Sequence, residues 1–313
     1  MTQETSVLVL GAGAIGAFYG AILHRAGARV SAVLRTEYET VRRAGFEIES
    51  ELGDLSFHPE AVYRDAGDCP ETPDILLVCL KVVDGIDRAA LMREAVGPNT
   101  TIVLVENGIG IEQEIAEAFP GNRLISGLAY VAVSRVAPGR VLHKAYGQLV
   151  FGNFPSGVDE VTEQLAALLE AGGVKATPTD DVVRERWRKC VWNVAFNPAS
   201  VVAGGADTRT MLDAPGGERF MMSLMLEVIA VASAEGYEFP EGMAETGLEQ
   251  TRMIPAHRNS MALDYLHGRP MELEAVLGNV IRAAERTHTP VPHLESVYVL
   301  AKMLLEKKPP LEG

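Results

Sequence analysis

The first half of the chain alternates short apolar runs with stretches of helical periodicity. Five runs rich in β-branched residues predict strands, at residues 6–10, 29–33, 75–79, 101–105 and 123–127. Helical stretches fall among them, at residues 14–26, 37–44, 84–95 and 110–118. Because the strand runs are continuously apolar, they are typical of parallel strands that helices cover on both faces. The pattern predicts a doubly wound α/β sheet.

The character of the chain changes in its second half. Two β-rich runs flank the turn signal Ala137-Pro138-Gly139 and predict a hairpin. After Pro178 the strand signal nearly ends, and helical periodicity recurs between prolines, at residues 180–203, 216–235, 242–253, 271–287 and 293–307. The sequence therefore predicts two domains, an α/β domain over residues 1–177 and an all-α C-terminal domain over residues 178–313.

A glycine motif stands at the first strand–helix junction. The run Gly11-Ala12-Gly13-Ala14-Ile15-Gly16 follows a predicted strand and opens a predicted helix, the setting in which G-x-G-x-x-G indicates dinucleotide binding. The first glycine allows a tight turn, the second lets a pyrophosphate approach the backbone, and the third lets helix and strand pack closely. A glycine-rich turn without a ligand is the alternative. The correct spacing of the next strand favours a Rossmann-type domain that binds a dinucleotide.

The end of the second strand indicates which dinucleotide binds. NAD-dependent enzymes usually end this strand with an acid that holds the ribose 2′-OH, whereas here the run ends in Leu34 and Arg35. An arginine can clamp a 2′-phosphate with two parallel hydrogen bonds. A solvated surface arginine is the alternative, and we expect NADP(H).

Lys81 and Asn107 also follow predicted strands, at the edge where such sheets bind ligands, although both residue types are common at surfaces and turns.

A polar stripe crosses an otherwise apolar helical segment early in the second domain. Lys189, Asn193 and Asn197 are spaced four apart and share one helix face. A solvated face is one interpretation. Asn is a poor helix former, however, and the other residues from Cys190 to Phe196 are apolar, so we favour a stripe that lines a cleft. Pro198 adds to this because it disfavours helical geometry at the residue before it.

Composition narrows the class of partner. The 313 residues include 28 Lys and Arg against 42 Asp and Glu, a formal net charge of -14, which disfavours nucleic acid and anionic membranes. Three separated cysteines predict neither a disulfide framework nor a metal site. The apolar stretch at residues 7–23 lacks a basic lead-in and contains glycines, so we do not expect a signal or membrane segment. A cytoplasmic enzyme with a small-molecule substrate is expected, and a homodimer stays open.

The chain resembles the ketopantoate reductase (2-dehydropantoate 2-reductase) family over essentially its whole length. The matching positions are Gly11–Gly16, Arg35, Lys81, Glu106-Asn107-Gly108, Lys189, Asn193, Asn197-Pro198, Ser260-Met261 and Glu272. The lysine–asparagine–asparagine spacing and the serine–glutamate spacing are the specific parts, because the glycine motif alone fits many enzymes.

The resemblance implies NADPH-dependent reduction of 2-dehydropantoate to (R)-pantoate, a step of pantothenate biosynthesis. It implies that Lys189 is the catalytic proton donor and that Glu272 supports the reacting centre or the cofactor ribose. A partly desolvated lysine has a lowered pKa that suits a general acid, and its charge stabilises a developing alkoxide. The cofactor carries the redox step, so no metal is needed.

The other matched positions are binding residues by the same resemblance. Asn193, Asn197 and Ser260 would contact the substrate. Asn107 would lie between cofactor and substrate, and Lys81 near the cofactor.

Two positions depart from the family. Asp207 falls where a further substrate-contacting asparagine is expected, and Glu106 falls where the family usually has a neutral or imidazole side chain. A reductase of another small 2-oxoacid and a nucleotide-binding protein without catalysis therefore stay as alternatives. Ser260 and Glu272 also have structural interpretations, as a helix cap and as an acid in a first helical turn.

Overall fold

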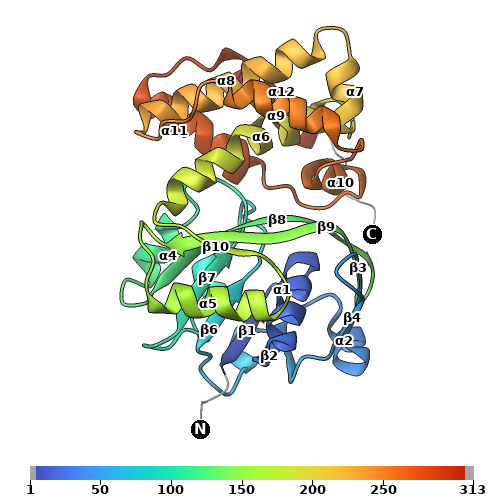
Figure 1. Ribbon diagram of the computed structural model, residues 1–313, viewed down its shortest axis with the longest axis vertical. Coiled ribbons are helices and arrows are strands. Elements are labelled where there is room, and N and C mark those ends of the chain that lie inside the picture. Colours follow the sequence, from blue (N-terminus) through green and yellow to red (C-terminus); the bar gives the residue numbers. More distant parts are fainter. Residues whose placement is uncertain (1–4, 307–313) are drawn as a thin grey trace. The chain divides into compact units, whose positions relative to one another are not determined.

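The computed structural model describes residues 5–306, and it divides into two compact units (Figure 1). Unit 1 comprises Met1–Lys81, Ile86–Glu106 and Ile111–Glu185, and unit 2 comprises Val82–Gly85, Asn107–Gly110 and Arg186–Gly313. Unit 1 is an α/β unit and unit 2 is helical, so the predicted fold class is confirmed. Two short segments of the first half belong to the helical unit, which pattern alone does not indicate.

Within the described residues, a ten-stranded sheet forms unit 1 in the order β4-β3-β9-β8-β7-β6-β1-β2-β5, with β10 paired to β9. Its parallel core contains the five predicted strands, which are β1 (Ser6–Leu10), β2 (Arg29–Val33), β6 (Ile75–Val78), β7 (Thr101–Val105) and β8 (Leu124–Ala137). Because β1 lies between β2 and β6, the winding direction reverses at β1. Ligands bind outside the carboxyl ends of strands at such a reversal.

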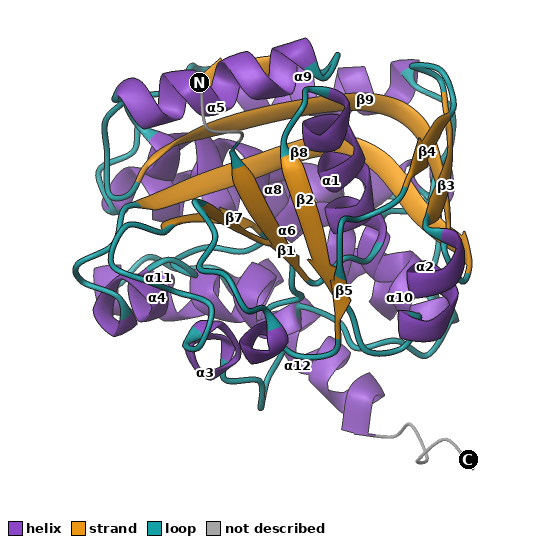
Figure 2. Ribbon diagram, turned by 90° about the horizontal axis from the view of Figure 1, so that it is seen from below, coloured by secondary structure: helices purple, strands orange, loops and turns teal. Residues whose placement is uncertain are grey.

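Helices cover both faces of this sheet (Figure 2). They are α1 (Ala14–Arg25) and α5 (Glu160–Ala171) on one face, and α3 (Arg88–Met92) and α4 (Gln113–Ala118) on the other. Successive residues of β1 enter the two cores in turn, Val9 on the α1 side and Leu8 on the α3 side. This explains why the strand has no polar face.

The predicted hairpin is present and longer than expected. It pairs β8 with β9 (Arg140–Asn153) in antiparallel register, with irregularities along its length. The strands and helices that the pattern missed are short, namely β3 (Phe46–Ser50), β4 (Leu55–Phe57), β5 (Val62–Tyr63), η1 (Ala66–Asp68) and β10 (Ala176–Pro178). In β3 the apolar residues alternate with exposed glutamates, so a search for continuous apolar runs does not find it. The predicted α2 (Tyr38–Ala44) is confirmed.

Within the described residues, unit 2 contains α6 from Arg186 onward, six further α-helices and a π-helical segment. They are α6 (Val182–Val202), α7 (Thr208–Asp213), α8 (Gly217–Ala234), α9 (Met243–Met253), α10 (Ser260–Leu266), η2 (Glu274–Gly278), α11 (Asn279–Thr287) and α12 (Pro292–Glu306). Helix α8 packs against α7, α9, α11 and α12, and its inward side is apolar. The pattern missed α7 and α10, which are too short to show helical periodicity.

The helices after β6 and β7 are shorter than predicted, because the segments before them belong to unit 2. Residues 84–95 and 110–118 were expected to be helical, but α3 begins at Arg88 and α4 at Gln113. The residues before them include Val82–Gly85 and Asn107–Gly110, which pack with unit 2 instead. Over residues 5–306, no helix is long and apolar enough to cross a membrane.

Candidate active site

The glycine motif forms an open cradle at the start of α1. Gly11 has a φ of +85°, and a Cβ atom there would lie 2.9 Å from the carbonyl oxygen of Cys79. A Cβ on Gly16 would lie 2.6 Å from the carbonyl oxygen of Gly11, so both positions require glycine for packing. At Gly13, by contrast, the nearest protein atom would be 4.0 Å away. The space above Gly13 is therefore left to a ligand, as a dinucleotide pyrophosphate requires.

The helix start also suits phosphate. Gly13 is the N-cap of α1, no side chain caps the helix, and its first turn has no acidic residue. The N–H groups there are available to an anion, and the helix dipole favours negative charge. The residues present therefore fit the phosphates of a dinucleotide.

Arg35 follows β2 with its side chain exposed. The nearest acid, Glu37, is buried and already bonded: Arg135 pairs with its carboxylate at 2.6 Å, and the backbone N–H of Gly139 donates to it at 2.9 Å. This glutamate holds the tip of the β8–β9 hairpin. Lys81 follows β6 and is exposed as well.

The polar stripe of α6 runs from a half-buried to a buried position. Lys189 and Asn193 are half-buried, and Asn197 is 4% exposed. Asn197 Oδ1 has no hydrogen-bond partner among the described residues. A buried acceptor without a partner is costly in a native structure. A donor group on a ligand, such as a hydroxyl, would satisfy it.

Lys189, Asn107 and Glu272 form one hydrogen-bonded group in unit 2. Lys189 Nζ donates to Asn107 Oδ1 at 3.0 Å. Since an ammonium is only a donor, it fixes the orientation of this amide, and Asn107 Nδ2 then faces Glu272 Oε2 at 3.5 Å. The other carboxylate oxygen of Glu272 accepts from the backbone N–H of Val82 at 3.1 Å. Glu272 therefore bonds to the two segments that follow β6 and β7, and it lies directly before the helical segment that begins at Leu273.

Lys189 has an unusual protonation equilibrium. Burial lowers its pKa to about 8, and the positive charge of Arg186 acts in the same direction. Cys190 and Glu272 oppose the shift with smaller effects. An ammonium with a pKa close to neutrality can both carry charge and give up a proton under physiological conditions.

Ser260 is the first residue of α10, and its neighbour caps the helix. Asn259 Oδ1 accepts from the backbone N–H of Ala262 at 2.8 Å, so the interpretation of Ser260 as the helix cap is wrong. Asn259 Nδ2 also donates to the carbonyl of Phe196 at 3.1 Å. Asn259, which the pattern did not single out, thereby joins the start of α10 to the turn of α6 that carries Asn197, and Ser260 itself is exposed.

The two departures from the family have local structural roles. Asp207 is the N-cap of α7, where its carboxylate accepts from the backbone N–H of Thr210 at 2.8 Å and its pKa is lowered by that bond. Glu106 is buried and pairs with the buried guanidinium of Arg88 at 2.7 Å. Each of these carboxylates therefore has a partner that compensates its negative charge, a backbone N–H for Asp207 and a guanidinium for Glu106.

The site residues divide between the units. The glycine motif, Arg35 and Lys81 belong to unit 1. Unit 2 holds the remaining predicted residues, which are Asn107, Lys189, Asn193, Asn197, Ser260 and Glu272. Across residues 5–306 no cluster of three or more His, Cys, Asp or Glu side chains could hold a metal ion.

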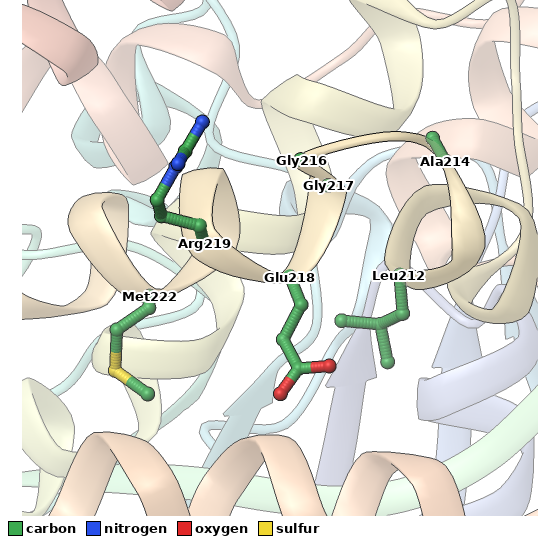
Figure 3. A pocket seen from close by; sticks show the side chains of 7 residues that line it. All are labelled: Leu212, Ala214, Gly216, Gly217, Glu218, Arg219 and Met222. Carbon is green, nitrogen blue, oxygen red and sulfur yellow. The ribbon is translucent and has the colours of Figure 1, made fainter.

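An open hollow in unit 2 lies apart from these residues. It has a volume of about 560 Å³ and is lined by Leu212, Ala214, Gly216, Gly217, Glu218, Arg219 and Met222, from the end of α7 to the start of α8 (Figure 3). None of the predicted catalytic or binding side chains lines it. The hollow is therefore separate from the lysine–amide–carboxylate group.

A glycine cradle on a doubly wound sheet and a half-buried lysine of lowered pKa define the class of a nicotinamide-dependent oxidoreductase. The family model "Ketopantoate reductase PanE/ApbA" matches residues 7–156, and its C-terminal counterpart, "Ketopantoate reductase PanE/ApbA C terminal", matches residues 181–305. The chain belongs to the ketopantoate reductase family and is an NADP-dependent oxidoreductase.

Individual relatives agree with this assignment. A 2-dehydropantoate 2-reductase from a Nostoc species is 31% identical, with 96% of each chain covered. The crystal structure of 2-dehydropantoate 2-reductase from Methylococcus capsulatus has a TM-score of 0.91 and 48% identity, covering 98% of this chain and 99% of that one. A ternary structure of D-mandelate dehydrogenase with NADH and anilino(oxo)acetate has a TM-score of 0.87 at 18% identity, covering 96% of this chain and 97% of that one. At that identity the likeness concerns the fold alone.

Proposed function

We propose that this enzyme reduces 2-dehydropantoate to (R)-pantoate with NADPH, as a step of pantothenate biosynthesis. The observation that carries the proposal is the contact of Lys189 Nζ with Asn107 Oδ1, on an amide that also faces Glu272. It supplies a positioned acid of suitable pKa in a chain whose relatives are named for this reaction.

Lys189 is the proton donor of the proposed reaction. The nicotinamide, when bound, supplies the hydride that reduces the C2 carbonyl, and the oxygen of that carbonyl then needs a proton. The ammonium of Lys189 stabilises the negative charge on this oxygen and then transfers its proton. Asn107 and Glu272 hold the amine in place, which reduces the loss of side-chain freedom during the reaction.

Asn193, Asn197 and Ser260 bind the substrate in this proposal. The unpaired Oδ1 of Asn197 accepts from a substrate hydroxyl, a group that 2-dehydropantoate carries and simple 2-oxoacids lack. Ser260, with its hydroxyl free of the capping role, donates to the substrate carboxylate. A site built to bond a hydroxyl rejects an analogue without it, because the buried acceptor is then left unpaired.

The proposed cofactor-binding residues are the glycine motif, Arg35 and Lys81 of unit 1, together with Asn107 of unit 2. Gly11, Ala12, Gly13, Ala14, Ile15 and Gly16 hold the pyrophosphate, Arg35 the 2′-phosphate, and Lys81 and Asn107 the remainder of the dinucleotide. We assign the NADP-binding role to residues 1–177 and the substrate-binding and catalytic role to residues 178–313. The cytoplasmic location stays a prediction.

A substrate panel tests the proposal. NADPH oxidation is followed with 2-dehydropantoate and with 2-oxoacids that match its size but lack the hydroxyl. The proposal expects the highest kcat/KM for 2-dehydropantoate, and it expects Asn197→Ala to remove most of the preference. A higher kcat/KM for a 2-oxoacid without the hydroxyl would make the enzyme a reductase of another acid, and no turnover of any acid would leave a nucleotide-binding protein.

A further inference from the structure

Arg186 is a buried arginine beside the lysine of the site. It lies on α6 three residues before Lys189, so the two side chains occupy the same side of the helix. Only 1% of its surface is exposed. A guanidinium is charged at every physiological pH, so this position holds a permanent positive charge inside unit 2. Burying such a charge is costly unless it is paired and hydrogen-bonded.

The guanidinium bonds to the loop that carries Asn107. Arg186 Nη1 donates to the carbonyl of Gly108 at 3.0 Å. Gly108 has a φ of +118°, and a Cβ atom there would lie 2.7 Å from the carbonyl oxygen of Ala275, so the loop passes closely over η2. The next residue continues the anchoring, since the N–H of Ile109 donates to that same carbonyl at 2.9 Å.

The position of Asn107 follows from these bonds. Its neighbour Gly108 is held by Arg186, and its own amide receives Lys189 Nζ. Arg186 and Lys189 thus reach the same dipeptide from one turn of α6. A change at Arg186 would move the acceptor of the lysine as well as the charge beside it.

The pKa of Lys189 responds to Arg186 and Cys190 on α6 and to Glu272 before η2. Arg186 is the one that lowers the pKa of Lys189, in addition to burial, whereas Cys190 and Glu272 raise it. Two cations one helical turn apart repel each other, and the repulsion is relieved when one of them loses its proton.

We propose that Arg186 is a positioning residue for the proton transfer, because its buried guanidinium holds the Asn107–Gly108 dipeptide against the turn of α6 that carries Lys189. The charge of the same guanidinium lies one helical turn from the ammonium and favours release of its proton. The inference rests on the proposed function of Lys189 as proton donor. It assigns to Arg186 a role in the chemistry rather than in folding alone.

The first experiment titrates Lys189 directly in the purified enzyme, without cofactor or substrate. Acetic anhydride modifies only the unprotonated amine, and mass spectrometry of the Lys189 peptide gives the extent of reaction at each pH. Arg186→Gln removes the charge and keeps a shorter amide donor, and Arg186→Met removes both the charge and the donor. Arg188→Gln is the matched control, because Arg188 is exposed and lies next to Lys189 on the same helix.

Both Arg186 variants should move the midpoint of Lys189 modification to higher pH, by roughly half a unit to one unit, and Arg188→Gln should leave it in place. An unchanged midpoint in Arg186→Gln, confirmed as folded by its melting curve, overturns the inference. If Arg186→Met does not fold, Arg186→Gln alone decides.

The second experiment separates charge from position. The pH profile of kcat should shift in the same direction in both variants, and kcat at neutral pH should fall by roughly three- to tenfold in Arg186→Gln and further in Arg186→Met. A purely structural role would lower the melting temperature without moving the profile. If the wild type does not reduce 2-dehydropantoate, the proposed function fails, while the modification midpoint still tests Arg186 on its own.

Discussion

Each unit buries one arginine against the same short stretch of chain, but their surroundings differ. Arg88 in unit 1 is 2% exposed and pairs with Glu106 at 2.7 Å and with Glu114 at 2.8 Å. It also donates to the carbonyl of Ile111 at 2.7 Å, so it spans the residues on either side of Asn107–Gly110. Arg186 in unit 2 donates to the carbonyl of Gly108 inside that segment, and its charge lowers the pKa of the neighbouring Lys189.

The difference separates two uses of buried charge. Around Arg88 the positive charge meets carboxylates, which makes the pair sensitive to the loss of one partner but inert toward protons. Around Arg186 the positive charge acts on a neighbouring ammonium, which makes a proton easier to release. We therefore expect substitutions in unit 1 to change stability, and substitutions near Lys189 to change turnover.

The largest expected effect is at Lys189. Lys189→Ala should lower kcat by about 10²–10⁴, the usual contribution of a positioned general acid. It should not lower the melting temperature, because it removes a cation that lies beside Arg186. NADPH affinity, measured by fluorescence titration, should stay close to that of the wild type. A variant with near-normal turnover would remove Lys189 from the mechanism.

Arg88→Met should have the opposite profile. It leaves the carboxylate of Glu106 buried without its guanidinium, which costs about 3–5 kcal/mol of unfolding free energy. The matched control is the double variant Arg88→Met with Glu106→Gln, which removes the stranded charge and should recover most of the loss. Urea denaturation measures both.

The pH profile of kcat sharpens the contrast. In the double variant it should match the wild type, since neither Arg88 nor Glu106 is among the groups that shift the pKa of Lys189. If the pH profile of kcat in the double variant is displaced as far as in Arg186→Gln, then Arg88 also affects the protonation of Lys189, and the contrast between the two arginines is wrong.

The sequence predicts those elements whose own residues determine them, and it does not predict elements that depend on contacts with residues far away in the sequence. The five core strands were predictable because each is apolar on both faces. The glycine motif was predictable from its spacing after the first strand, although Gly11 packs against the distant Cys79 and only the contact of Gly16 with Gly11 is local. The short helices α7 and α10 were not, since their existence depends on caps such as Asp207 and Asn259 and on packing against neighbours.

The candidate site shows the same limit. The spacing of Lys189, Asn193 and Asn197 indicated one helix face, and the family resemblance added Glu272 and Ser260. No pattern indicated that Asn107 would pack with the helical unit, nor that Arg186 and Arg88 would be buried, because an arginine in a sequence is ordinarily a surface residue. Their roles follow from tertiary contacts to Gly108, Glu106 and Ile111.

The next prediction concerns Arg35, an exposed residue of unit 1, and its proposed contact with the 2′-phosphate of the cofactor. Arg35→Ala should weaken NADPH binding by roughly 10- to 150-fold, the worth of one bidentate charged contact. NADH binding should change little, because NADH lacks the 2′-phosphate. The comparison of 2′-phospho-ADP-ribose with ADP-ribose in calorimetry isolates this contact from the nicotinamide. Equal affinity of the wild type for both compounds would make Arg35 a solvated surface residue.

Ser260 and Asn259 are adjacent residues for which we expect different kinds of effect. Asn259→Ala removes the cap of α10 and its bond to α6, and should cost about 0.5–2 kcal/mol of stability. Ser260→Ala should leave the melting temperature nearly unchanged and raise the KM for the substrate. A lower melting temperature with unchanged kinetics in Ser260→Ala would return that residue to a structural role.

The smallest expected effect concerns His143, a buried histidine of β9 in unit 1. Its Nδ1 is 2.8 Å from the hydroxyl of Ser50 and its Nε2 is 3.1 Å from the carbonyl of Ala145, while its ring lies on Phe18. Burial lowers its pKa below the ordinary 6.5. The folded state therefore binds this proton less readily than the unfolded state does. Stability from this group is present above pH 6.5 and is lost as the pH falls from 6.5 through the lower folded pKa, by at most about 1.4 kcal/mol per pH unit.

Melting temperatures between neutral and mildly acidic pH should fall less steeply in His143→Gln than in the wild type, whereas the exposed His58→Gln should follow the wild type. Parallel curves for all three proteins would mean that the acid sensitivity of unit 1 arises elsewhere.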